Sequence, residues 1–111
     1  MNLKLKIIKI PFKSSNKGVV IFVWFSSFIY IMEVERQKRK EEDLKKLAKR
    51  IRSLRQEKGY SNYENFAYVN ELPRAQYGRY EKGEDLKFSS LMKVIRALGV
   101  SVKEFFSEGF D

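Results

Sequence analysis

Apolar residues recur at helical spacing in several short runs between Leu44 and Phe106, and glycines separate these runs. The first run takes every third or fourth position from Leu44 to Leu54 and stops before Gly59. This spacing lines one face of an α-helix, and glycine readily ends one. Because each run is short and meets a stop signal, the region predicts an all-α bundle of four to five short helices.

Capping signals place the second and third helices. Ser61 and Glu64 have the spacing of a capping box, in which the two side chains satisfy unpaired backbone N–H groups. The helix that follows turns Phe66 and Ala67 inward. Pro73, with its fixed φ and missing N–H, suits the first turn of a third helix.

The fourth and fifth helices are expected after Gly83, which ends the third. Ser89 or Ser90 caps the fourth helix, and Gly99 stops it. Its inward residues are Leu91, Val94, Ile95 and Leu98. A second capping box, beginning at Ser101, predicts a short closing helix.

Composition limits the chemistry that the chain can perform. Its 111 residues carry 23 Lys and Arg against 14 Asp and Glu, a net charge of +9, with no Cys and no His. The excess of positive charge favours polyanions such as nucleic acid or acidic lipid. Without thiolates or imidazoles, and with no nucleophile placed beside a base, we expect no catalytic residue, no metal, no cofactor and no enzymatic activity.

Residues 1–32 differ from the rest of the chain. They hold five lysines and no acid, and Gly18–Met32 is an uncharged run rich in aromatic and β-branched residues. The run is shorter than the roughly 20 residues of a spanning helix, so membrane contact by residues 18–32 is marginal. One alternative is a β-hairpin that pairs Leu3–Ile7 with Val19–Phe25. Another is that translation begins at Met32.

The sequence thus divides into three parts: an N-terminal appendage (1–32), a charged lead-in (33–43) and a helical domain (44–111). In the lead-in nearly every residue is charged, which fits a solvated helical entry or a frayed linker. The clusters Glu41–Asp43 and Glu84–Asp85 are interpreted as solvated surface rather than metal ligands.

The third helix has one basic face of low profile. At about 100° per residue, Tyr77 and Tyr80 fall on the side that packs. The opposite side carries Arg74, Ala75, Gly78, Arg79 and Lys82. Small residues let a helix approach base edges, and arginine can address guanine in two hydrogen bonds, so Arg74, Ala75, Gly78 and Arg79 are predicted to read bases. Predicted phosphate contacts are Lys82, Arg52 and Lys58.

Four stretches together resemble the Cro/CI-type family of phage-repressor-like proteins, also called XRE. They are Ile51–Gly59, Glu64–Ala67, Tyr80–Gly83, and Leu91–Val100 with Phe105–Phe106. The resemblance implies a lambda-repressor-like fold whose second and third helices form a helix-turn-helix that binds double-stranded DNA. It also implies a cytoplasmic, sequence-specific transcriptional regulator, a small stand-alone repressor that binds as a homodimer.

The same resemblance suggests roles for particular residues. A polar residue at the start of the second helix usually meets phosphate, which is Asn62 or Tyr63 here, and Arg55 is expected to form a structural ion pair with Glu81. Two departures affect this transfer: one extra residue lies between Gly59 and Ala67, and the turn 70–73 lacks the usual small residue. Alternatives for the same fold are the antitoxin of a toxin pair and a protein-interaction or membrane-tethered module.

Overall fold

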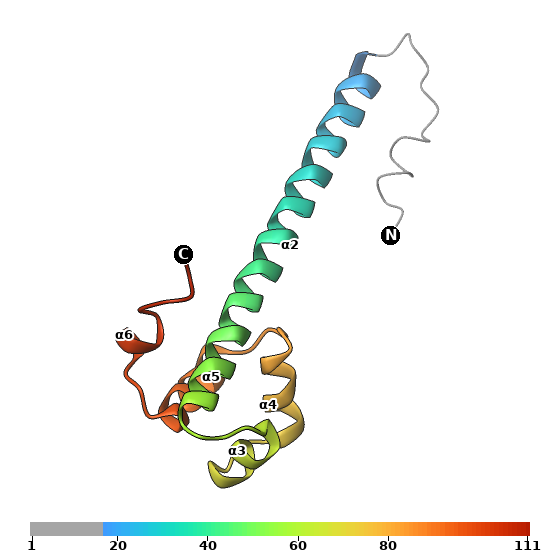
Figure 1. Ribbon diagram of the computed structural model, residues 1–111. Coiled ribbons are helices and arrows are strands. Elements are labelled where there is room, and N and C mark those ends of the chain that lie inside the picture. Colours follow the sequence, from blue (N-terminus) through green and yellow to red (C-terminus); the bar gives the residue numbers. More distant parts are fainter. Residues whose placement is uncertain (1–16) are drawn as a thin grey trace. The chain divides into compact units, whose positions relative to one another are not determined.

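A computed structural model describes the backbone of residues 17–111 and the side chains of residues 20–111. Within this range every regular element is a helix (Figure 1). The helices are α2 (Lys17–Glu57), α3 (Tyr63–Val69), α4 (Arg74–Glu81), α5 (Phe88–Leu98) and α6 (Val102–Phe105). The expected all-helical class is confirmed.

The first helix is much longer than the sequence pattern indicates. It was expected to begin near Leu44, but α2 begins at Lys17 and runs for 41 residues. Between Val19 and Glu57 the chain contains neither glycine nor proline, so nothing interrupts the helix. The β-hairpin interpretation is therefore wrong for Val19–Phe25, which is helical, and its other strand, Leu3–Ile7, lies outside the described residues.

The chain divides between Arg39 and Lys40 into two units, and α2 contributes to both. In the first unit, large apolar side chains between Ile21 and Val34 are exposed. Residues 33–43 of the charged lead-in are helical and exposed throughout. None of the helices in residues 17–111 has the length and apolar character required to cross a bilayer.

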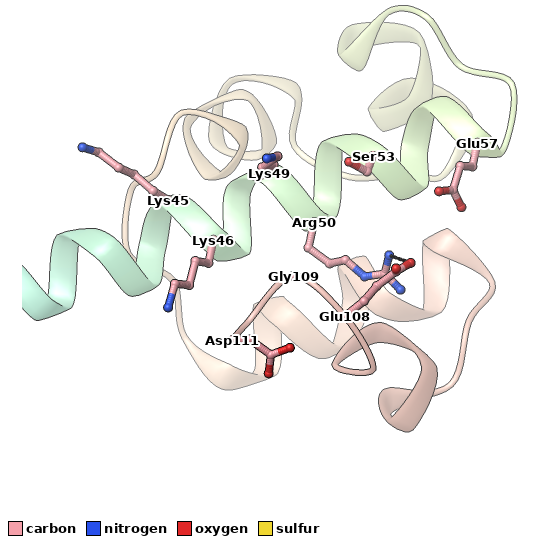
Figure 2. A pocket seen from close by; sticks show the side chains of 9 residues that line it. All are labelled: Lys45, Lys46, Lys49, Arg50, Ser53, Glu57, Glu108, Gly109 and Asp111. Atoms are coloured by element: carbon pink, nitrogen blue, oxygen red, sulfur yellow. Dashed lines mark hydrogen bonds and ion pairs between the residues drawn. The ribbon is translucent and has the colours of Figure 1, made fainter.

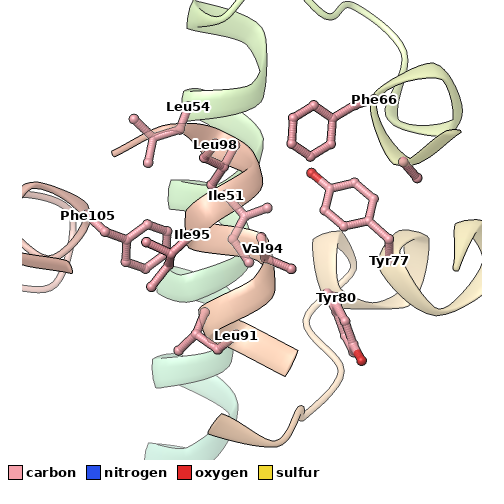
Figure 3. Packing of buried hydrophobic residues seen from close by; sticks show 11 residues of the cluster. Ile51, Leu54, Phe66, Tyr77, Tyr80, Leu91, Val94, Ile95, Leu98 and Phe105 are labelled. Carbon is pink, nitrogen blue, oxygen red and sulfur yellow. The ribbon is translucent and has the colours of Figure 1, made fainter. Parts of the chain in front are cut away.

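The second unit is built around one apolar core (Figure 3). Ile51 and Leu54 of α2 pack with the inward residues of α5, while Phe66 of α3 and Phe105 of α6 complete the cluster. All four inward residues expected for α5 are buried. The rings of Phe66 and Tyr77 lie 5.3 Å apart, which links α3 to α4.

The starts of three further helices differ from the expected ones. Asn62, not Ser61, is the N-cap of α3, and its side chain accepts a hydrogen bond from the Glu64 N–H at 2.7 Å. Pro73 lies one position before α4, as its N-cap. Neither serine caps α5, because that helix already begins at Phe88. Only the cap of α6 is as expected: Ser101 Oγ accepts from the Glu104 N–H at 3.0 Å.

Three helices end in the same hydrogen-bonded turn. After α3, the Leu72 N–H donates to Ala67 O and the Glu71 N–H donates to Tyr68 O, which is the Schellman pattern. The turns after α2 and α4 repeat this pattern, with Gly59 and Gly83 at the position of positive φ. After α3 that position is taken by Glu71 at φ 57°. A residue with a Cβ is strained there.

Replacing Glu71 by glycine should therefore stabilise the protein. A left-handed conformation costs an L-residue roughly 1–2 kcal/mol, and glycine avoids this cost. Because glycine also gives the unfolded chain more conformational freedom, part of the stabilisation is lost, and we expect a net gain of about 0.5–1 kcal/mol in the free energy of unfolding. Chemical denaturation followed by circular dichroism measures it.

Glu71→Ala is the matched control, since it removes the charge but keeps a Cβ. If Glu71→Ala stabilises as much as Glu71→Gly, the gain comes from charge and the backbone argument is wrong.

Candidate nucleic-acid interface

The α3–α4 pair is held together by a ring lying over a glycine. A Cβ built on Gly78 would lie 2.7 Å from Cε2 of Tyr63, so any other residue there would require the ring to shift. Gly78 is buried and Tyr63 is half-buried. The prediction that Gly78 belongs to an open base-reading face is wrong, because the start of α3 covers this position.

The exposed face of α4 is consequently rotated from the expected one. Arg74, Ala75 and Arg79 are exposed, as is Gln76, which the sequence reasoning missed. At about 100° per residue, Gln76 neighbours Arg79 on the side away from Gly78. The signal that could have identified Gln76 is its chemistry: a glutamine amide can form two hydrogen bonds with adenine.

Arg79 already has an acidic neighbour. Its Nε lies 3.1 Å from Glu84 Oε2, and both side chains are more than half exposed. Exposed ion pairs of this kind contribute at most about 1 kcal/mol, so Arg79 can exchange Glu84 for another acceptor at little cost. Glu84 was not expected at the site.

The start of α3 lies beside the start of α4. An open hollow between them is lined by Tyr63, Glu64, Pro73, Arg74 and Ala75. Asn62, the cap of α3, is exposed at the same helix end. The unpaired N–H groups of a helix N-terminus attract anions, and Arg74 adds a full positive charge, whereas Glu64 opposes it.

The predicted phosphate contacts fall into two groups. Lys82, the C-cap of α4, is exposed beside the same helix. Arg52 instead donates to the Glu81 backbone O at 2.6 Å, and Lys58 Nζ donates to Ala97 O at 2.6 Å, near the end of α5. Because Arg52 and Lys58 already donate to backbone carbonyls near helix ends, they are not proposed as phosphate contacts.

A buried ion pair fixes α4 to α2. Arg55 Nε donates to Glu81 Oε2 at 2.8 Å and Arg55 Nη2 donates to Oε1 at 2.9 Å. Its third nitrogen, Nη1, donates to Tyr60 O at 2.6 Å. Both side chains are about 5% exposed. Hydrogen bonding to Glu81 raises the pKa of Arg55 against the opposing effect of burial, so the guanidinium stays charged.

Tyr77 lies close to this pair with an unsatisfied hydroxyl. Its side chain is 1% exposed, and within residues 20–111 the hydroxyl has no hydrogen-bond partner. Burial raises the pKa of the Tyr77 phenol, and the Glu81 carboxylate raises it further. The phenol is therefore neutral. Its ring packs in the core, whereas its hydroxyl contributes no hydrogen bond among the described residues.

One basic residue of α2, Arg50, is buried. It is 6% exposed and donates to Phe105 O at 2.8 Å, to Glu104 O at 2.9 Å and to Glu108 Oε1 at 2.9 Å. Figure 2 shows it reaching from α2 toward Glu108. Arg50 therefore holds the end of α6 by its backbone carbonyls.

Nearby lysines border this contact without joining it. A hollow beside α2 is lined by Lys45, Lys46 and Lys49 on one side and by Glu108, Gly109 and Asp111 on the other. The ammonium groups of Lys45 and Lys46 point away from the Arg50–Glu108 contact (Figure 2).

Two short helices joined by a tight turn, the second with an exposed basic face, define a helix-turn-helix of the DNA-binding kind. A family model described as helix-turn-helix matches residues 51–105, and the chain belongs to this Cro/CI-type family. Proteins of the family are DNA-binding regulators and are typically not enzymes. Comparisons with curated proteins and with solved structures found no significant match.

The Arg55–Glu81 pair should behave as a unit. Arg55→Met or Glu81→Leu alone leaves a buried charge unpaired and should lower the free energy of unfolding by about 3–5 kcal/mol. The double variant removes both charges, so its loss should be well below the sum of the single losses. Equilibrium denaturation of the four proteins measures this coupling.

Arg52→Met is the control, because the Arg52 side chain is half exposed and its carboxylate contact is longer, 3.9 Å to Glu81 Oε1. It should cost less than about 1 kcal/mol. Additive losses from Arg55→Met and Glu81→Leu would contradict the pairing argument.

Tyr77→Phe should not destabilise the protein. The substitution keeps the ring and removes a hydroxyl that is buried without a partner, so stability should be unchanged or rise by about 1 kcal/mol. Thermal and chemical denaturation test this, with Tyr77→Leu as the variant that loses the ring packing. A loss above about 1 kcal/mol for Tyr77→Phe would mean that the hydroxyl is hydrogen-bonded after all.

Proposed function

We propose that this protein is a sequence-specific transcriptional regulator that represses by occupying an operator in double-stranded DNA, in the cytoplasm and without catalysis. The observation that carries the proposal is the exposed, basic, low-profile face of α4. Arg74, Gln76 and Arg79 surround Ala75 there, and all four are exposed. A helix of this shape fits the major groove.

Base reading is assigned to Arg79, Gln76 and Arg74, with Ala75 permitting close approach. An arginine guanidinium matches guanine O6 and N7, and a glutamine amide matches adenine N6 and N7. The ion pair of Arg55 with Glu81 supports the assignment, because Glu81 is the last residue of α4 and its carboxylate is held at 2.8 Å and 2.9 Å. A helix fixed to the core can present its side chains in a constant geometry.

Phosphate contacts are assigned to Asn62, Tyr63 and Lys82, which flank the two helices. Asn62 caps α3 through its side-chain oxygen, leaving the amide nitrogen to donate to a phosphate. The Tyr63 hydroxyl lies near Gly78 of α4, and Tyr63 lines the hollow between the two helices. These contacts orient the domain on DNA without carrying sequence information.

We further infer that two copies bind together. A single module of this size buries roughly 600–1,000 Å² on DNA, which is small for tight and specific binding. Two copies on the same face of DNA, about one helical turn or roughly 34 Å apart, would double the contact. The expected operator therefore contains two half-sites.

Substitutions in α4 separate reading from anchoring. After selection of the preferred sequence from a random DNA pool, Arg79→Ala should lose about 1–3 kcal/mol of discrimination at one base position. Lys82→Ala should instead weaken binding to all sequences alike and reduce the salt-dependence slope by about 0.9. Fluorescence anisotropy at several salt concentrations measures both effects.

Glu84→Gln serves as the matched variant, because it frees Arg79 from its exposed partner without touching α4. It should strengthen DNA binding by up to several-fold. Equal and sequence-independent losses for Arg79→Ala and Lys82→Ala would remove Arg79 from base reading. A folded protein that binds no DNA would favour the alternative of a protein-interaction module.

A further inference from the structure

One stretch of α2 exposes apolar side chains over about half of its circumference. The exposed residues, which we name the apolar segment, are Ile21, Phe22, Trp24, Phe25, Phe28, Ile29, Ile31, Met32 and Val34. Their exposed fractions range from 45% at Met32 to 75% at Trp24. At about 100° per residue, all of these residues except Val34 fall on one half of the helix, whereas Ser26 and Ser27 lie on the other half.

This distribution decides between kinds of partner. A second helix in a coiled coil covers a narrow stripe, two positions in seven, and would leave much of the apolar segment in water. A broad apolar face with polar residues opposite is typical of a helix that lies in the plane of a lipid surface. A lipid surface can cover the whole of such a face, which a single partner helix cannot.

Charge and length favour a particular lipid surface. Residues 1–32 contain five lysines and no acid, which favours anionic headgroups. The uncharged run Gly18–Met32 lies between Lys17 and Glu33 and spans only about 22 Å as a helix, less than the roughly 30 Å of a bilayer core. A segment of this length can keep both charged ends at the headgroups of one leaflet.

We propose that the apolar segment of α2 enters the boundary region of an anionic lipid bilayer and anchors this regulator to the membrane surface. Trp24 and Tyr30 are of the residue types that favour this region, because their rings are apolar with a polar edge. The lysines before the segment attract the anionic headgroups. The inference goes beyond DNA binding and does not depend on it.

The protein contains a built-in probe, since Trp24 is its single tryptophan and lies within the apolar segment. Full-length protein is mixed with vesicles of phosphatidylcholine and phosphatidylserine. Tryptophan emission should shift to shorter wavelength, and lipids brominated on their acyl chains should quench it. Vesicles of phosphatidylcholine alone should bind the protein at least about tenfold more weakly.

Paired variants test the contribution of the segment. Phe22→Ser with Phe25→Ser removes two large side chains that are 66% and 63% exposed, and should weaken vesicle binding by about two orders of magnitude. Phe88→Ser is the control, because Phe88 is 72% exposed but belongs to α5. It should leave vesicle binding unchanged. Anisotropy with operator DNA should be the same for the double variant and the parent, which separates this test from that of DNA binding.

Two results would overturn the proposal. One is an emission spectrum that vesicles do not change. The other is an emission spectrum that is already shifted without lipid, in protein that self-associates in sedimentation experiments and stays associated when vesicles are added. That result would mean that the apolar segment packs against a second copy of this chain.

Discussion

The buried pairing of Arg55 with Glu81 is the contact on which the presentation of α4 depends. It joins the last turn of α2 to the last residue of α4 through two charged hydrogen bonds, and the same guanidinium binds the carbonyl of Tyr60 in the connection to α3. One side chain therefore sets the positions of three elements. Removing two opposite charges from water is costly, and only this satisfied geometry offsets the cost. The Arg55–Glu81 pair holds α4 against α2 and so helps to determine which face of α4 is exposed.

The arginines and lysines of the second unit have distinct uses that charge alone does not reveal. Arg50 and Lys58 donate to carbonyls at the ends of α6 and α5, and Arg52 donates to the carbonyl of Glu81. Cations placed at helix C-termini are stabilised by the helix dipole. The basic side chains that remain exposed along α4, Arg74 and Arg79 with Lys82 after it, are those proposed to meet DNA. A moderately basic domain can thus present a locally basic surface.

The long helix α2 combines two kinds of surface. Toward its C-terminal end it has an apolar stripe that packs into the core, with Ile51 fully buried. Around Trp24 its apolar side chains cover a wider face of the helix, and they are exposed. The apolar stripe near the C-terminal end is buried by other helices of the chain, whereas the apolar side chains around Trp24 are exposed. This contrast is the physical basis for proposing a lipid partner.

The sequence by itself determined the helical class, the ends of the helices at glycines and the inward residues of α5, because periodicity and backbone freedom are local properties. It also singled out the start of α6, where Ser101 accepts a local hydrogen bond. Its failures are equally physical. Ser61 and Asn62 are both good caps by residue type, and local spacing does not show that Asn62 is the one that accepts from the Glu64 N–H.

Tertiary structure alone decided which face of α4 is open. A wheel drawn from the sequence treats a small residue as an approach surface, but Gly78 is small because a ring from α3 lies against it. For the same reason the sequence analysis did not identify Gln76, which is exposed on α4. Local spacing specifies where a side chain points relative to its own helix. What covers it is decided by residues far away in the chain, since burial is a property of the packed core.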